Sequence, residues 1–332
     1  MSLAAPQRWW QRLRALFTPP GTVDPGLDLP PDFLQLLERL RLLSIRAVGG
    51  GVRQGHRLGA YRGGQLEFHD YRAYTPGDDL RYLDWNLYAR MEKAFIKEFA
   101  REEAGAVHIL LDGTPSMSLG TPSKWTFARR LAALLAHVAW TGQDIVQVSI
   151  FRSPQHPLSV YPPKGNKGNT AQLLDWLRRE RLGTLDRSQD ISQVRSAEAL
   201  SDGVRQFLSS TASKGRAFLL SDFWDGEEAL TAAFHRLTVS GFELSAVHVL
   251  SPEELAPPDA GDWRLIADEE AGEVELAVTR PVLERYASEL EAYRAAVEGL
   301  VRRRGGLYLF APSNTSLERV LIHALRRRLW VA

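Results

Sequence analysis

The chain has 332 residues, of which 44% are hydrophobic and 24% charged, and it contains no cysteine. This composition is typical of a soluble globular protein with one large or two modest domains, and it excludes disulfides, thiolate zinc sites, iron–sulfur clusters and a cysteine nucleophile. A formal net charge of +1 argues against strong attraction of the whole molecule to nucleic acid. We therefore expect a cytoplasmic protein, because a cysteine-free chain suits a reducing compartment, and we expect no nucleic-acid partner.

The first predicted element is a basic amphipathic helix within residues 8–17, whose apolar side is formed by Trp9, Trp10, Leu13, Leu16 and Phe17. Such a helix suits docking on a protein surface, which we favour, or peripheral contact with a membrane. No stretch reaches the roughly 18–20 apolar residues of a spanning helix, so we expect no transmembrane span. The prolines and glycines of residues 18–31 indicate a linker. Residues 1–31 are therefore expected to be dispensable for folding.

Residues 32–104 are predicted to form a helix followed by a small β-rich subdomain. Residues 32–48 have the apolar spacing of a helix, and residues 49–64 form a loop rich in glycine and arginine. Apolar and polar residues then alternate as in strands at residues 65–74 and 93–100. The sequence TPGDD after the first of these strands indicates a turn, because proline presets one backbone angle and glycine permits a positive φ.

Strand-like and helix-like segments alternate from residue 105 to residue 332. Strand patterns lie at 106–112, 144–151, 216–222, 242–250 and 306–312, and helical patterns at 123–140 and about 170–182, 196–212, 226–240, 282–304 and 315–330. This alternation predicts a mainly parallel sheet with helices on both faces. We expect an α/β, Rossmann-type fold with a six-stranded sheet, strand 106–112 at its centre, and a hairpin inserted at about 261–278.

Polar side chains cluster where the predicted parallel strands end, the edge at which such sheets bind ligands. They are Asp112, Thr114 and Ser116 after the first strand, Thr170 at the start of a helix, and Ser221 and Asp222 at the end of strand 216–222. Carboxylates and hydroxyls are hard oxygen ligands, which suit Mg²⁺ and its retained waters. We therefore predict a Mg²⁺ site, with Mn²⁺ or Ca²⁺ as alternatives.

The sequence DGTPS, followed by a distant threonine and a distant aspartate, resembles the metal-ion-dependent adhesion site of von Willebrand factor A domains. That site has an Asp-x-Ser-x-Ser loop, a distant Thr and a distant Asp. The resemblance implies a von Willebrand factor A-like fold for residues 105–332 and a metal held by Asp112, Thr114, Ser116, Thr170 and Asp222. Thr114 replaces the usual first serine and keeps its hydroxyl. Taken by itself, DGTPS favours a capped helix turn.

A second resemblance covers about residues 32–250. The segment LEFHDYRAYTPGDDLRYLDWNLYAR, followed by FIKEFAREE, is similar to the hallmark of the domain of unknown function 58 family. Members of this family are commonly associated with MoxR-type AAA+ ATPases, and many carry N-terminal membrane helices that we do not find here. The resemblance implies a soluble accessory partner of such an ATPase.

The hallmark segment combines arginines and aromatic residues, the composition of an interaction surface. Its alternating charges equally suit a solvated, ion-paired hairpin. We expect some pairs to fix the subdomain and others to meet a partner. The candidate partner-binding residues are Arg72, Asp78, Asp79, Arg81, Asp84, Trp85 and Arg90.

These observations together predict a non-enzymatic, metal-dependent protein-interaction module. A carboxylate of the ATPase, or of an acidic segment of a client protein, would complete the coordination of Mg²⁺. The alternative is a divalent-metal-dependent hydrolase or phosphotransferase that uses the same carboxylates. The strand followed by Asp-Gly-Thr is also similar to that of haloacid-dehalogenase phosphotransferases, but Thr114 stands where these have a second aspartate. No general base or nucleophile is evident beside the predicted metal, so we assign no catalytic residue.

Overall fold

The computed structural model describes residues 27, 29, 33, 35, 37, 38, 66–101, 105–152, 156–165, 168–183, 199–211, 213–256, 261–265, 274–278 and 280–320. The predicted basic helix at 8–17, the loop at 49–64 and the last part of the predicted helix at 315–330 lie outside these residues. The chain divides into two compact units. Unit 1 is Met1–Val52 with Gly105–Ala332, and unit 2 is Arg53–Ala104. Each is described separately.

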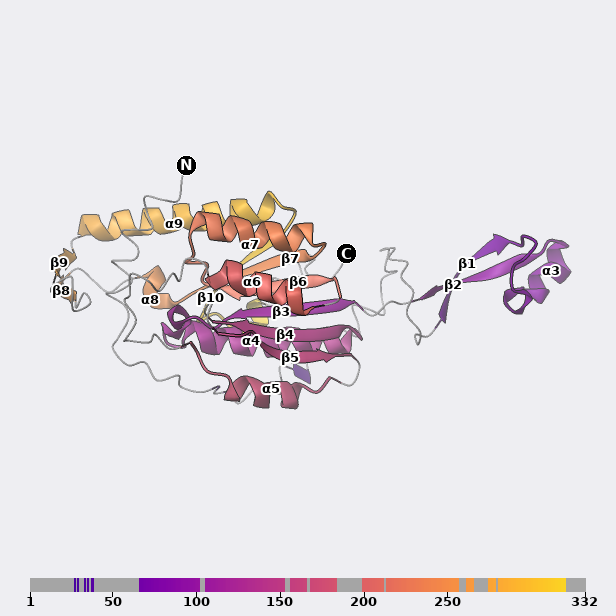
Figure 1. Ribbon diagram of the computed structural model, residues 1–332, viewed down its shortest axis with the longest axis horizontal. Coiled ribbons are helices and arrows are strands. Elements are labelled where there is room, and N and C mark those ends of the chain that lie inside the picture. Colours follow the sequence, from indigo (N-terminus) through magenta and orange to yellow (C-terminus); the bar gives the residue numbers. More distant parts are fainter. Residues whose placement is uncertain are drawn as a thin grey trace. The chain divides into compact units, whose positions relative to one another are not determined.

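Unit 1 contains a six-stranded sheet with the strand order β10-β7-β6-β3-β4-β5 (Figure 1). Neighbouring strands are parallel except for β4 and β5, which are antiparallel. The strands are β3 (Ala106–Asp112), β4 (Ile145–Phe151), β5 (Ser159–Lys164), β6 (Arg216–Ser221), β7 (Glu243–Leu250) and β10 (Leu307–Pro312). The predicted six-stranded, mainly parallel sheet is confirmed, and β3 lies in its interior between β6 and β4.

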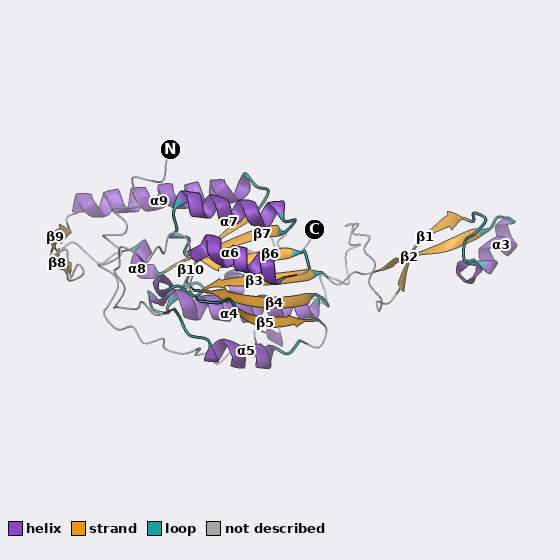
Figure 2. Cartoon of the chain, viewed as in Figure 1, coloured by secondary structure: helices purple, strands orange, loops and turns teal. Residues whose placement is uncertain are grey.

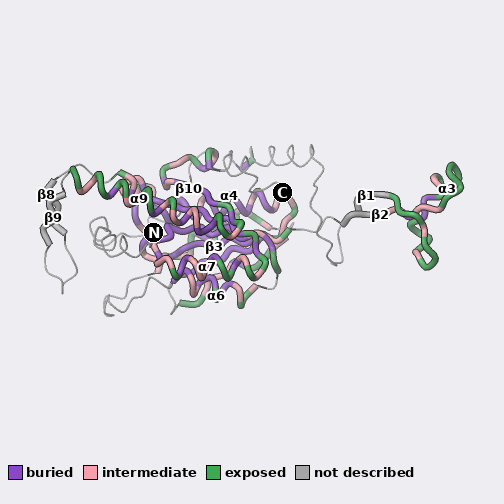
Figure 3. The backbone as a smooth tube through the Cα atoms, turned by 90° about the horizontal axis from the view of Figure 1, so that it is seen from above, coloured by how far each residue is buried: buried purple, intermediate pink, exposed green. Residues whose placement is uncertain are grey.

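Helices cover both faces of this sheet (Figure 2). They are α4 (Lys124–Thr141), α5 (Thr170–Arg179), α6 (Ala199–Ser210), α7 (Glu227–Val239) and α9 (Arg280–Arg302). Side chains of β3 alternate between the two layers: Ile109 and Leu111 pack with α4 and α5, whereas Leu110 packs with α6, α7 and α9. Strand β3 lies within the buried part of the chain in Figure 3, and β4, β6 and β7 are buried almost throughout. Burial on both faces explains why these four strands read as continuous apolar runs.

Strand β5 was not predicted from the sequence. Its sequence, SVYPPK, contains Pro162 and Pro163, which lack the N–H groups that a ladder needs. The structure places β5 at the edge of the sheet, antiparallel to β4. Edge strands tolerate proline because one side of the strand needs no partner.

Residues from the predicted linker and the predicted helix at 32–48 pack into the core of unit 1. Phe33 and Leu37, one helical turn apart, are buried in the same core cluster as α4, and Leu27 joins them. Leu29 packs against this cluster. The expectation that residues 1–31 are separate from the core is therefore wrong at Leu27 and Leu29, because a linker residue with an apolar side chain can still fill a gap beside a helix.

Unit 2 contains a two-stranded antiparallel sheet of β1 (Leu66–Ala73) and β2 (Phe95–Arg101). Between them lie a short 3-10 helix, η1 (Leu80–Tyr82), and the unpredicted helix α3 (Trp85–Met91). Gly77 has a φ of 110°, as the predicted turn requires. Asp84 caps α3 by accepting the backbone N–H groups of Asn86 and Leu87, so this short helix begins at a conventional N-cap.

The hairpin predicted at about 261–278 is present as β8 (Gly261–Leu265) and β9 (Val274–Val278), which pair in antiparallel fashion. It follows a single-turn helix, α8 (Pro252–Leu255). Among the residues that the structure describes, no helix combines the length and the apolar character needed to cross a bilayer.

Candidate functional site

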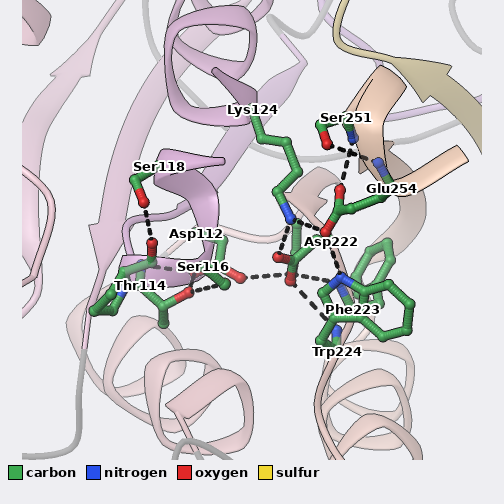
Figure 4. A network of polar contacts seen from close by, with 12 residues as sticks. Asp112, Thr114, Ser116, Ser118, Lys124, Asp222, Phe223, Trp224, Ser251 and Glu254 are labelled. Atoms are coloured by element: carbon green, nitrogen blue, oxygen red, sulfur yellow. Dashed lines mark hydrogen bonds and ion pairs between the residues drawn. The ribbon is translucent and has the colours of Figure 1, made fainter. Parts of the chain in front are cut away.

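The loop after β3 gathers three oxygen-bearing side chains. One carboxylate oxygen of Asp112, Oδ1, accepts hydrogen bonds from the backbone N of Thr114 at 2.9 Å and from its Oγ1 at 2.6 Å. The hydroxyl of Ser116 lies 2.9 Å from that of Thr114. Figure 4 shows Asp112, Thr114 and Ser116 side by side. Ser221 donates to the other oxygen of Asp112, Oδ2, at 2.6 Å. The predicted convergence of Asp112, Thr114 and Ser116 is therefore present, and Ser221 belongs to the same group.

The local sequence explains how the strand turns here. A Cβ at Gly113 would lie 2.9 Å from Cγ2 of Ile150 and 3.1 Å from the carbonyl O of Phe151, so only glycine permits this close approach. Thr114 is the extended N-cap of a 3-10 helix, η2 (Pro115–Ser118), with Pro115 at its first position. Proline suits that position because its fixed φ is preorganised for a helix start. The turn thus holds the hydroxyls beside Asp112.

Asp222 lies directly after β6 and is held by a lysine from another element. Its Oδ2 accepts a hydrogen bond from Nζ of Lys124 at 2.7 Å, and its Oδ1 accepts one from the backbone N of Trp224 at 3.3 Å. The intervening residue, Phe223, is buried and has a φ of 52°. Backbone in the left-handed region is strained for a bulky residue and occurs most often at functional sites.

Lys124 also reaches a second carboxylate. Its Nζ donates to Oε1 of Glu254 at 2.7 Å, and Lys124 is 0% exposed. Glu254 is fixed by a capping box with Ser251, and its Oε1 accepts a hydrogen bond from Nε1 of Trp224 at 3.1 Å. Tyr286 of α9 donates to the carbonyl O of Glu254 at 2.5 Å. One ammonium group, carried by the first residue of α4, thereby joins the carboxylates that follow β6 and β7, as Figure 4 shows.

The charges in this group do not balance. Asp112, Asp222 and Glu254 are buried carboxylates, whereas Lys124 is the cation within ion-pair distance of Asp222 and Glu254. No lysine or arginine of the described residues forms an ion pair with Asp112. Burial and, secondly, the charge of Asp222 raise the pKa of Asp112 to about 6. Oxygen donors with excess negative charge match what a small divalent cation needs.

Thr170 does not belong to this group. Its Oγ1 lies 3.0 Å from Nδ1 of His137, near the C-terminal end of α4. Because α4 runs back from the end of β3, that helix end lies at the opposite edge of the sheet. The antiparallel β5 brings the chain there, since its last residue, Lys164, pairs with Val146 at the start of β4. The prediction of Thr170 as a metal ligand is therefore wrong, and the cause is the unpredicted β5.

The chain returns to the correct edge after α5. The backbone N of Gly183 donates to the carbonyl O of Gly113 at 2.8 Å, immediately beside the loop that contains Asp112. Residue 184 in the sequence is a threonine, which lies outside the described residues. The threonine to test as a hydroxyl ligand of the metal is therefore the one that follows α5 in the sequence, and not Thr170 at the start of that helix.

Most of the candidate partner-binding charges in unit 2 are paired with one another. Arg72 contacts both oxygens of Asp78 at 2.8 and 2.9 Å, which holds the pKa of Asp78 well below its usual value. Arg81 pairs with Asp79 at 2.6 Å. These contacts lie within the turn between β1 and α3, so each of these charges already has a partner inside unit 2.

Asp84 is likewise a structural residue. It is 7% exposed, accepts a hydrogen bond from the hydroxyl of Tyr71 at 2.9 Å and forms an ion pair with Lys97 at 3.1 Å. The backbone N–H of Leu87, followed by Lys97 and Tyr71, lowers the pKa of Asp84 to about 2. Its buried carboxylate fixes α3 against β1 and β2 and is not available to a partner.

Trp85 and Arg90 are exposed on α3, as expected of partner-binding residues. Trp85 is 62% exposed, and its ring meets that of Tyr88 edge to face at 6.3 Å. We use the name tip patch for the exposed large apolar side chains of this region, which are Leu80, Tyr82, Trp85, Tyr88 and Met91. The sequence signal for the patch was the i, i+3, i+6 spacing of its last three members, which requires recognition of α3.

Lys124 and Glu254 were missed by sequence reasoning. Lys124 lies beside Trp125 at the start of a predicted amphipathic helix, where a lysine ordinarily remains in solvent. The sequence SPEE from Ser251 to Glu254 has the S-x-x-E pattern of a capping box, which predicts a helix start and not a contact with α4. Ser221 was noted beside Asp222 but was not assigned to the site.

Comparison with known proteins identifies relatives that cover most of the chain. Residues 70–296 match the family described as protein of unknown function DUF58. Uncharacterised proteins of Mycobacterium bovis and Mycobacterium tuberculosis are 25% identical over 320 residues, which cover 88% of this chain and 88% of theirs.

Several solved structures are also similar. The conserved hypothetical protein BatB from Bacteroides thetaiotaomicron matches 68% of this chain and 98% of its own, with 14% identity and a TM-score of 0.40. An aerotolerance-related membrane protein from Bacteroides fragilis matches 67% of this chain and 100% of its own, with 18% identity and a TM-score of 0.38. On the extent of the family match, this chain belongs to the DUF58 family.

Proposed function

We propose that this protein is a non-enzymatic, metal-dependent protein-interaction module, with a von Willebrand factor A-like adhesion site at the carboxyl edge of its sheet. Asp112, Thr114 and Ser116 would hold Mg²⁺, with Mn²⁺ or Ca²⁺ as alternatives. The observation that carries the proposal is the state of Asp112: it is 1% exposed, it is bound by hydroxyls and one amide, and no cation of the described residues pairs with it. A buried carboxylate is costly without a compensating positive charge.

Asp222 would contribute differently from Asp112. Oδ2 of Asp222 is paired with the cation Lys124 and Oδ1 accepts the backbone N–H of Trp224, whereas the donors to Asp112 are all neutral. Mg²⁺ keeps several of its waters and takes few direct carboxylate ligands. We therefore assign Asp222 a contact through a metal-bound water, and we leave one coordination position for a carboxylate of another protein. That carboxylate would come from a partner ATPase or from an acidic segment of a client.

The partner that family resemblance favours is a MoxR-type AAA+ ATPase in the cytoplasm. The tip patch is the second candidate contact, because five large apolar side chains are exposed within residues 80–91, and exposed apolar side chains close to one another mark protein-interaction sites. Trp85 is suited to anchor such a contact, since tryptophan is enriched among the residues that dominate binding energy. Metal and tip patch would then give the partner two separate points of attachment.

Calorimetric titration with Mg²⁺ tests the metal site. Asp112→Asn keeps the size of the side chain and removes its charge, so we expect Mg²⁺ affinity to fall at least a hundredfold (about 2.7 kcal/mol) while the protein stays folded. Thr170→Ala is the matched control, because Thr170 lies at the opposite edge, and it should bind Mg²⁺ as the wild type does. Undiminished affinity in folded Asp112→Asn would contradict the proposal.

A further variant decides where the missing hydroxyl ligand lies. Thr184 follows Gly183, whose N–H contacts the loop of Asp112. If Thr184 has the role predicted for Thr170, Thr184→Ala will weaken Mg²⁺ binding roughly tenfold (about 1.4 kcal/mol), less than Asp112→Asn because no charge is removed. An unchanged affinity would assign that coordination position to water.

Partner binding needs a test that does not disturb the ATPase, which itself uses Mg²⁺ with its nucleotide. Removal of Mg²⁺ by a chelator would affect both proteins. Affinity capture from the native host at constant Mg²⁺, with wild type, Asp112→Asn and Thr170→Ala as baits, avoids this difficulty. We expect the ATPase with wild type and Thr170→Ala and its loss with Asp112→Asn. Equal capture by all three baits would contradict a metal-dependent contact.

The alternative is a metal-dependent hydrolase or phosphotransferase. Asp112 would be its nucleophile, but Thr114 stands where the haloacid-dehalogenase phosphotransferases have a second aspartate, which favours the non-enzymatic role. Hydrolysis of p-nitrophenyl phosphate in the presence of Mg²⁺, lost in Asp112→Asn, would establish the enzymatic alternative.

A further inference from the structure

Lys124 is unusual because it is a lysine buried at the carboxyl edge of the sheet, next to the proposed metal site. It is 0% exposed, and its ammonium group lies 2.7 Å from Asp222 and 2.7 Å from Glu254. The free-energy cost of transferring an ammonium ion from water to a protein interior is offset only when its charged partners are well placed. Both partners are fixed independently: Asp222 by the backbone of Trp224, and Glu254 by its capping box with Ser251. The lysine is thus held in one place.

The position of this lysine divides the three carboxylates into two kinds. Asp222 and Glu254 share the positive charge of Lys124, whereas Asp112 has no ion pair with a described residue. The group as a whole retains two formal negative charges in excess. An incoming divalent cation is therefore attracted mainly to Asp112 and meets a fixed positive charge on the side of Asp222.

We propose that Lys124 is a positioning residue of the metal site, which holds Asp222 out of direct coordination and limits the affinity for Mg²⁺, while Glu254 balances its charge. The inference rests on the proposed metal-binding function. Its consequence is a weak, exchangeable metal, such that a partner carboxylate adds substantially to the coordination. A contact that depends on both metal and partner is reversible, as an accessory protein of an ATPase requires.

Two substitutions in the same network should change Mg²⁺ affinity in opposite directions. Lys124→Met removes the positive charge and leaves Oδ2 of Asp222 without its ion pair, so we expect calorimetric titration to show Mg²⁺ bound about tenfold more tightly. Glu254→Gln leaves Lys124 balanced by Asp222 alone and removes one negative charge, so we expect about tenfold weaker binding. A residue that merely supports the fold would lower stability in both variants without this reversal of sign.

Arg129 supplies the matched control. It is a second buried cation on α4, also 0% exposed, and it donates to the carbonyl O of Leu177 at 3.2 Å and lies 5.0 Å from the ring of Trp125. Arg129→Met should lower the stability of the protein as Lys124→Met does, because each removes a buried charge and its contacts. Its Mg²⁺ affinity should stay within twofold of the wild type.

The outcomes separate this inference from the function on which it rests. If wild type binds Mg²⁺ but Lys124→Met binds it equally or more weakly, the role of Lys124 is overturned and the metal site stands. Should Lys124→Met fail to fold, Glu254→Gln decides by itself: unchanged or tighter binding overturns the inference. If the wild type binds no Mg²⁺, the proposed function fails and the inference fails with it.

Discussion

The ion pairs of unit 2 and those at the carboxyl edge of unit 1 both join a basic side chain to a carboxylate, but the first are exposed and the second are buried. In unit 2 the Arg81–Asp79 pair has side-chain exposures of 83% and 40%, whereas in unit 1 the Lys124–Asp222 pair has 0% and 2%. Exposed pairs contribute little to stability because water and salt screen them. Removal of one partner of a buried pair leaves an uncompensated charge in a medium of low polarity. The same chemistry therefore shapes a turn in one unit and builds a charged site in the other.

The hydrophobic residues are distributed in the opposite sense. Unit 2 exposes the tip patch, and Leu83 and Ile96 are its buried apolar residues among those described. Unit 1 buries its apolar side chains in two layers on either side of the sheet. A two-stranded hairpin with a small core is marginally stable by itself, and its aromatic side chains at Tyr82, Trp85 and Tyr88 are exposed. Unit 1 provides the rigid support that a metal site requires.

The largest expected difference between the two regions is in stability. In metal-free buffer, Lys124→Met should lower the free energy of unfolding of unit 1 by about 3–5 kcal/mol, because Asp222 and Glu254 lose their shared cation. Arg81→Met removes the exposed partner of Asp79 and should leave the stability unchanged. Urea unfolding followed by circular dichroism measures both. Equal losses in the two variants would show that burial does not distinguish the pairs.

A smaller effect concerns the pH dependence of stability without metal. Burial and the charge of Asp222 raise the pKa of Asp112 to about 6 in the folded protein, from its usual value of 3.8. The favourable contribution of protonated Asp112 is complete below pH 3.8 and is lost as the pH rises through about 6. The asparagine of Asp112→Asn cannot ionise, so the variant does not lose stability in this way as the pH rises. The effect of Asp112→Asn on the free energy of unfolding should therefore be more favourable at pH 7.5 than near pH 4, by roughly 1–3 kcal/mol.

Urea unfolding of wild type and Asp112→Asn in EDTA, at pH 4 and at pH 7.5, gives this comparison. At each pH the free energy of unfolding of Asp112→Asn is compared with that of the wild type. The titration of buried histidines such as His108 is common to both proteins and cancels in this difference. A stability difference that is the same at both pH values would contradict the raised pKa of Asp112.

The smallest expected effect on stability is at the tip patch. Trp85→Ala should leave the free energy of unfolding unchanged, because Trp85 is 62% exposed, yet it should reduce capture of the partner from a lysate of the native host. Val239→Ala is the control, since Val239 is an apolar residue of α7 in unit 1 that is 71% exposed. If both variants capture the partner as the wild type does, the tip patch is not its binding surface.

The spacing of apolar residues along the sequence predicted those strands and helices that are buried along most of their length. The buried strands at 106–112 and 216–222 and the helix at 123–140 agree with β3, β6 and α4 to within a residue or two. Strand β5 was not predicted, because its prolines argue against a strand unless that strand lies at the edge of a sheet. That omission reversed the direction of the chain before α5 and placed Thr170 at the wrong end of the sheet.

The site was predicted where it is local in sequence and missed where it is not. Asp112, Thr114 and Ser116 belong to one turn, and Asp222 follows a recognisable strand. The contacts of Lys124 with Asp222 and Glu254 join residues 98 and 130 positions apart. No local pattern distinguishes a lysine that will be buried from one that remains in solvent, because its partners are brought to it only by the folded sheet.

The central claim is that the buried, unpaired charge of Asp112 binds a divalent cation, and the Mg²⁺ dependence of unfolding tests it most directly. A ligand that binds only the folded state stabilises it by RT ln(1 + [L]/Kd), which is about 2.7 kcal/mol at a hundredfold excess over Kd. We predict that the free energy of unfolding of the wild type rises with Mg²⁺ concentration, by about 1.4 kcal/mol for each tenfold increase above Kd, whereas that of Asp112→Asn stays constant. A wild type that gains no stability from Mg²⁺, or an Asp112→Asn variant that gains as much, would contradict the account.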